Sequence, residues 1–185
     1  MDLTKYNHLI RTADDFLEAA ERCSFDDSLK VHKWPLTIPH FTNRAFACEL
    51  YIKATLYLTK NVLPRGHKLD KLFSNLNKED KKGMYDIWRT IAGENMPDCD
   101  YAKKMFYDNL EANSNVFTRF RYVHEWAGKT ISLESSFVEE QMHLHGLTIK
   151  NFKTPTIPIY DGFLDQLAKS IKKYNIKLGK LKLKE

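Results

Sequence analysis

The chain has 185 residues, of which 43% are apolar and 12% aromatic, with few glycines and prolines. This composition predicts one folded domain over residues 1–185 and argues against collagen-like, low-complexity or wholly disordered protein. The longest uncharged apolar stretch, residues 54–59, is far shorter than the roughly 20 residues that a membrane-spanning helix needs. The N-terminus has neither the basic nor the apolar region of a secretory signal. We therefore expect a cytoplasmic protein with no membrane partner.

The formal net charge of +5 is concentrated at the C-terminus. Residues 171–185 hold six of the 29 basic side chains and one of the 24 acidic ones, so the first 170 residues carry 23 of each sign. The sequence therefore predicts a neutral body and a basic C-terminal tail over 171–185. Three roles for this tail are open. It binds RNA regardless of sequence, it solubilises the protein, or it pairs as a strand, because apolar and polar residues alternate at 176–178 and 181–183.

Apolar residues recur every three or four positions along most of the chain, a spacing that predicts helices. Thr12, followed by acidic residues, is expected to cap a first helix. A second, longer helix is expected from about Pro39 to Asn61, where the turn residues 64–66 follow.

Six shorter helices are expected after this turn. They are a helix at 69–76, one opened by Asn77 with Asp80, one after the loop 93–100, one from residue 113 or 114 to before Gly128, one from Ser132 to Gly146, and one capped by Asp161 after an extended connector at 148–160. Helices this short are marginal alone, so they must pack on one another. The sequence predicts an all-α, up-and-down bundle of about six to eight helices.

The sequence contains none of the short motifs typical of phosphate-binding loops, zinc peptidases or serine hydrolases. The three cysteines are widely spaced and are expected to be reduced core residues. His143 and His145 lie two residues apart, so on a helix their rings point to opposite faces and cannot share a metal ion. His67 is expected to form a hydrogen bond at the start of a helix. We therefore expect no metal and no cofactor.

Three segments in the middle of the chain carry a family pattern. They are A-C-E-L-Y-I-K-A-T-L at 47–56, H-K-L-D-K-L-F at 67–73 and F-T-R-F-R-Y-V-H-E at 117–125. Together they resemble the HEPN domains, which are all-α, nucleotide- and RNA-associated domains of prokaryotic defence and toxin–antitoxin loci. The resemblance covers about residues 45–126.

The resemblance implies an activity, a site and partners. Many HEPN proteins are metal-independent endoribonucleases with an arginine, four to six residues and then a histidine, a spacing that Arg119 and His124 satisfy. The histidine would accept the proton of an RNA 2′-hydroxyl, and the arginine would stabilise the charge on the phosphate. On one helix the two residues lie about 140° apart. The resemblance therefore also implies a homodimer whose two motifs line one cleft, with RNA and an antitoxin or nucleotidyltransferase as partners.

The same segment allows an alternative without catalysis. An arginine–histidine pair readily arises by chance, and Phe120 stands where the active families usually have a polar residue. The family pattern F-x-x-x-R-Y-x-x-E makes Arg121, one turn before Glu125, the matching arginine. This pair could join Glu49 and Lys53, themselves an i, i+4 pair, in a structural charge cluster. Two hypotheses follow: an RNA-cleaving effector of phage defence or a toxin–antitoxin system, or a non-catalytic HEPN module that binds nucleotide, RNA or a protein.

Overall fold

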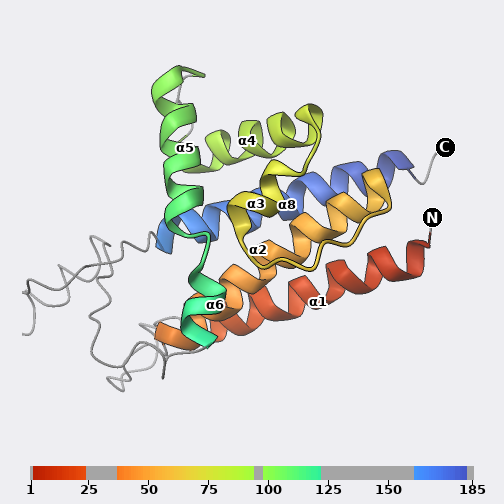
Figure 1. Cartoon of the computed structure of the whole chain (residues 1–185), viewed down its shortest axis with the longest axis horizontal. Helices are drawn as coiled ribbons and strands as arrows, with labels where there is room; N and C mark the ends of the chain where they lie inside the picture. The colour runs from red at the N-terminus through yellow and green to blue at the C-terminus, as the bar shows by residue number, and fades with distance from the viewer. Residues whose placement is uncertain (1, 24–36, 94–97, 122–160, 183–185) are drawn as a thin grey trace, which may run out of the picture.

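The computed structural model describes residues 2–23, 37–93, 98–121 and 161–182, and these residues form seven α-helices and no strand. The helices are α1 (Leu3–Arg22), α2 (Thr37–Lys60), α3 (Leu69–Ser74), α4 (Lys78–Ala92), α5 (Asp100–Ala112), α6 (Val116–Arg121) and α8 (Asp161–Lys182), as Figure 1 shows. The all-α prediction is confirmed. None of these helices combines the length and apolar character that a bilayer span requires.

Helix α2 is the centre of the molecule. It packs against α1, α3, α6 and α8, while α4 packs on α8 and α3 packs on α5. Helices α1, α2 and α8 run side by side along the molecule, and the two chain termini lie at the same end (Figure 1). Because α2 has neighbours on several sides, most of its residues after His40 are buried, as expected for a helix that is apolar around much of its circumference.

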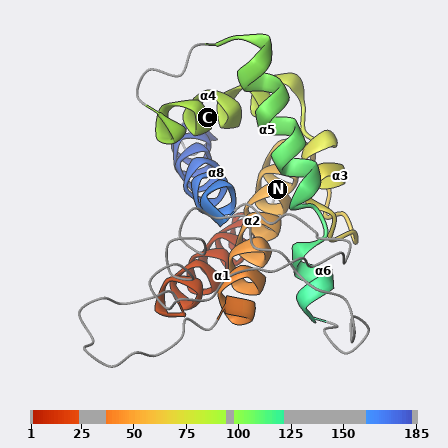
Figure 2. The ribbon, with the colours of Figure 1, turned by 90° about the vertical axis from the view of Figure 1, so that its left-hand side faces the viewer.

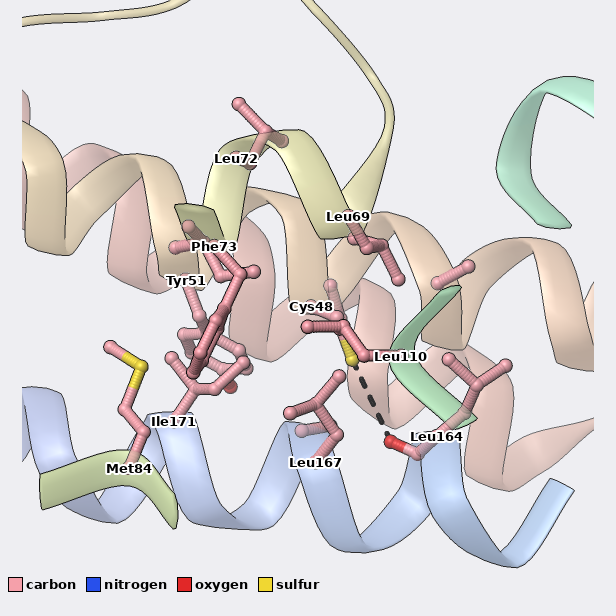
Figure 3. Close-up of a cluster of buried hydrophobic side chains, with 14 of the residues drawn as sticks. Cys48, Tyr51, Leu69, Leu72, Phe73, Met84, Leu110, Leu164, Leu167 and Ile171 are labelled. Atoms are coloured by element: carbon pink, nitrogen blue, oxygen red, sulfur yellow. Dashed lines mark hydrogen bonds between the residues drawn. The ribbon is translucent and has the colours of Figure 1, made fainter. Parts of the chain in front are cut away.

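The core is formed where α3, α4, α5 and α8 meet α2. Figure 3 shows Leu164, Leu167 and Ile171 of α8 pointing toward α2, with Cys48 placed so that its thiol donates to the Leu164 carbonyl at 3.6 Å. The other residues labelled there are Tyr51, Leu69, Leu72, Phe73, Met84 and Leu110. All ten are at most 2% exposed, so this layer supplies a large part of the hydrophobic stabilisation.

The first helix begins earlier than the sequence analysis predicts. α1 starts at Leu3 and not after Thr12, because Asp2 caps it and accepts a hydrogen bond from the Thr4 amide at 2.9 Å. Tyr6 is buried, and Leu9 and Ile10 pack against the core, so the added turns are part of the packed helix. The predicted helix start at Thr12 is therefore wrong.

The C-terminal residues also differ from their prediction. The strand that the alternation at 176–183 suggests is not formed, because α8 continues without a break to Lys182. Residues 171–182 are therefore the second half of a packed helix and not a free basic tail. Ile171 and Asn175 are buried on one face of it, and the Tyr6 hydroxyl donates to the Asn175 carbonyl at 3.0 Å.

Other helix starts agree with the predictions. Asn77 caps α4, and its side chain accepts a hydrogen bond from the Asp80 amide at 2.7 Å. Helix α5 follows the 93–100 loop, and α8 begins at Asp161. The expected helix at 132–146 and the connector at 148–160 lie outside the described residues.

Candidate functional site beside helix α6

A buried carboxylate lies in the middle of α2. The Glu49 side chain is 1% exposed and accepts a hydrogen bond from the Lys53 ammonium at 2.8 Å. The Nδ1 atom of His67 lies 3.0 and 3.2 Å from its two oxygens, and because a carboxylate only accepts, Nδ1 carries the hydrogen. We call Glu49, Lys53 and His67 the Glu49 cluster. Its two basic members compensate a charge that would otherwise be costly to bury.

Two of the three members of this cluster, Glu49 and Lys53, form a pair that the sequence predicts. The Glu49–Lys53 pair is confirmed, although its acid is buried rather than solvated. His67 forms a hydrogen bond directly before the start of α3 at Leu69, as predicted, and its partner is the Glu49 carboxylate of α2. Glu49 and His67 are 18 residues apart, so no local spacing reveals their contact.

Helix α6 is fixed directly beside the Glu49 cluster. The ring of Phe117 stacks on Phe46 of α2, with centroids 4.6 Å apart and planes at 14°. Its centroid also lies 5.5 Å from that of the His67 ring. Val116, the first residue of α6, is fully buried. Figure 2 shows α6 on the side of α2 opposite to α8.

The turn before α6 is fixed by hydrogen bonds between Ser114 and the start of α3. The Leu69 amide donates to the Ser114 carbonyl at 3.2 Å, and the Asp70 amide lies 3.3 Å from the Ser114 hydroxyl oxygen. That hydroxyl in turn donates to the Asp70 carboxylate. Burial alone would raise the pKa of Asp70, but hydrogen bonds from Ser114 and Lys71 and the charge of Lys71 outweigh it and lower the pKa.

Comparison with known families bears on this arrangement. A family model of the HEPN domain matches residues 6–126, well over half of the chain. The protein belongs to the HEPN domain family. The match spans α1 to α6 and all three residues of the Glu49 cluster, and it begins about 40 residues before the segment that the motifs alone identified. A search of curated proteins and a search of solved structures gave no match.

The two arginines of the HEPN motif occupy different faces of α6. Position 121 lies about 40° from Phe117 around the helix, whereas position 119 lies about 160° from it. Because Phe117 faces α2, position 121 lies on the side of α6 that packs beside the Glu49 cluster. Position 119 lies away from Phe117 but about 60° from the buried Val116. His124 and Glu125 lie outside the described residues. The pairing of Arg119 with His124, and that of Arg121 with Glu125, therefore stay predictions.

A second group of ionisable residues joins α2 to α8. The buried guanidinium of Arg44 lies 3.4 Å from the Asp165 carboxylate. Burial raises the pKa of the neighbouring Cys48 thiol to about 12. A thiol with such a pKa is almost entirely protonated at neutral pH and is a poor nucleophile, so Cys48 is a core residue. In the described parts of the chain, no three His, Cys, Asp or Glu side chains are arranged to hold a metal ion.

Proposed function

We propose that this HEPN domain is a metal-independent endoribonuclease that acts as a homodimer in a phage-defence or toxin–antitoxin system. Arg119 and His124 carry the reaction. The observation that supports this most is the anchoring of α6, because its first residues, Val116 and Phe117, are buried and Phe117 stacks on Phe46 of α2. A catalytic arginine on this helix needs such a rigid base.

The proposed reaction is an internal transfer at a phosphate of RNA. His124 accepts the proton of the 2′-hydroxyl, the 2′-oxygen bonds to the adjacent phosphorus, and the bond from phosphorus to the 5′-oxygen breaks. The leaving 5′-oxygen takes up a proton from solvent, and His124 afterwards releases its proton to solvent. Arg119 donates to the phosphate oxygens and stabilises their charge as the fifth bond forms. The products are a 2′,3′-cyclic phosphate and a 5′-hydroxyl, and the protein residues alone supply the chemistry.

Helix geometry supports the homodimer that the family resemblance implies. If the helix continues to His124, that residue and Arg119 lie about 140° apart and cannot meet one phosphate from the same chain. A two-fold contact brings the arginine of one copy toward the histidine of the other, and such dimers are the commonest soluble assemblies. Light scattering at micromolar concentration should therefore report a dimer, while a monomer alone would count against the shared site.

Cleavage of single-stranded RNA in the presence of EDTA tests the proposal. The wild-type protein should produce 2′,3′-cyclic phosphate ends, and Arg119→Ala or His124→Ala should lower the rate at least by about 10² to 10⁴. Both variants should melt at the wild-type temperature, because neither residue is assigned to the core. Cleavage at the wild-type rate by His124→Ala would refute the proposal.

The alternative, a non-catalytic HEPN module that binds nucleotide, RNA or a protein, is favoured by one observation. The face of α6 that carries position 121 packs beside the Glu49 cluster, where an arginine would serve helix packing. In this case Arg121→Ala should lower the melting temperature, and His124→Ala should change nothing. The two melting curves together with the cleavage rate separate the alternatives.

A further inference from the structure

The outer face of α8 carries a row of lysines. Lys169, Lys173, Lys177 and Lys180 are all exposed, and helical spacing places them within a sector of about 80°. This sector lies opposite to the buried face of α8, whose side chains point into the core in Figure 3. We call these four lysines the basic ridge. Successive members are about 4.5 to 6 Å apart along the axis, so the ridge is a dense line of positive charge.

Most of this charge is not neutralised by nearby acids. Lys169 pairs with Asp165 at 2.7 Å, but α8 has no acidic residue after that position. For Lys173, Lys177 and Lys180, no carboxylate lies within 4.0 Å in the part of the chain that the structure describes. These three lysines therefore keep their charge available to a ligand.

One acid on each flank of α8 is held by a partner outside the basic ridge. On the α1 side, Asp14 lies 2.8 Å from Lys172 and also accepts from the Tyr51 hydroxyl. On the α4 side, Asp80 accepts from the Tyr174 hydroxyl at 2.7 Å. These two acids are therefore held by partners other than the ridge lysines, and the positive potential of the basic ridge is directed to solvent.

We infer that the basic ridge binds the phosphate backbone of RNA and holds the substrate of the proposed nuclease on the domain. This inference rests on the proposed function for the identity of the bound polymer. Lysine ammonium groups attract phosphates as point charges, so this binding is independent of base sequence. Binding also releases counterions from the RNA, so it is steeply dependent on salt. The ridge lies outside the residues that the HEPN family model matches and is a property of this chain's own C-terminal helix.

An anionic membrane is the main competing ligand for a basic helix. A helix that lies on a membrane inserts an apolar face between the lipids, but the apolar face of α8 is buried in the core. Only Ile176 and Leu181 are large apolar residues exposed on α8, at 48% and 54%. The ridge offers charge without an insertable surface, and this favours RNA.

Binding of the full-length protein to a single-stranded 2′-O-methyl RNA tests the inference, because this RNA lacks the 2′-hydroxyl and cannot be cleaved. The variant is Lys173→Gln with Lys177→Gln and Lys180→Gln. The matched control is Lys71→Gln with Lys103→Gln and Lys104→Gln, which removes the same charge from lysines that face Asp70, Asp98 and Asp108. The logarithm of the binding constant should fall less steeply with the logarithm of salt in the ridge variant, by about 2. The control should keep the wild-type slope.

Three results would overturn the inference. They are equal slopes for the ridge variant and the wild type, equal losses in the ridge and control variants, and ridge-dependent binding to phosphatidylserine–phosphatidylcholine vesicles without binding to RNA. Cleavage of unmodified RNA is measured in parallel. If the wild type cleaves and the ridge variant keeps its RNA affinity, only the inference fails. If the ridge binds RNA and no RNA is cleaved, only the nuclease proposal fails.

Discussion

The two sides of α2 use charged residues in opposite ways. Beside α6, the Glu49 carboxylate is almost completely buried, and the Lys53 side chain that pairs with it is only 13% exposed. On α8, across α2 in Figure 2, Lys173, Lys177 and Lys180 face solvent with no carboxylate near them in the described residues. The same residue type therefore holds the fold together on one side and is free to bind a ligand on the other.

This difference separates stability from binding. A lysine that compensates a buried acid cannot be removed without leaving that acid in an apolar environment, whereas a solvated lysine contributes little to folding. Substitutions in the Glu49 cluster should therefore lower the free energy of unfolding. Substitutions in the basic ridge should change ligand binding and leave that free energy nearly unchanged.

The largest expected effect on stability comes from removing the charge of Lys53, with the same change at Lys177 as the comparison. Lys53→Met should lower the free energy of unfolding by about 3 kcal/mol, because Glu49 then keeps only the half-exposed His67 as a partner. Lys177→Met should change it by no more than about 0.5 kcal/mol. Urea denaturation at pH 7 measures both values. Equal, small effects would show that Glu49 does not depend on Lys53.

A smaller effect is expected on the inner face of α8. A Cβ atom at Gly83 of α4 would overlap the ring of Tyr174, whose hydroxyl is already bonded to Asp80. Gly83→Ala should therefore lower the free energy of unfolding by about 1–3 kcal/mol, although alanine is the better helix former. Gly162→Ala is the control, because a Cβ there meets nothing within 4 Å. Thermal melting should show a loss in the first variant and none in the second.

Local patterns predicted much of the fold. The Asn77 cap and the Glu49–Lys53 pair each depend on residues three or four apart, so the sequence alone indicates them. The start of α1 is also a local signal, because Tyr6, Ile10 and Ala13 continue the helical spacing back toward Asp2. Thr12 is an equally good cap by composition, and only the packing of Tyr6 decides between them.

Other features depend on contacts between distant residues. His67 reaches Glu49 because the segment after α2 folds back along it. The sequence does not show how far α8 extends. The buried Asn175 interrupts the apolar spacing, although the helix continues past it. Its side chain is satisfied by Thr55 at 3.1 Å and by the Tyr51 carbonyl at 3.2 Å, partners more than 100 residues away. No pattern in the sequence shows that an asparagine there is buried.

The smallest expected effect concerns the partly buried pair of Asp70 and Ser114 beside α6. The pKa of Asp70 is lowered, so its folded pKa lies below the unfolded value, and its ionised form stabilises the fold above that unfolded value. This stabilisation is lost as the pH falls through the folded pKa. Because Ser114 supplies the strongest of the lowering hydrogen bonds, Ser114→Ala should destabilise the protein at pH 7 and by less at pH 3. Urea denaturation at the two pH values measures the difference.

A main-chain hydrogen bond and an Asp70→Asn background provide the controls for this last prediction. The Leu69 amide still donates to the carbonyl of residue 114 in Ser114→Ala, so the turn before α6 keeps its main-chain link, and only the bonds made by the hydroxyl are lost. In an Asp70→Asn background, which has no carboxylate to titrate, the effect of Ser114→Ala should be the same at pH 7 and pH 3. If the effect still shrank at low pH in this background, the pH dependence would arise elsewhere, and the ionisation of Asp70 would not be its source.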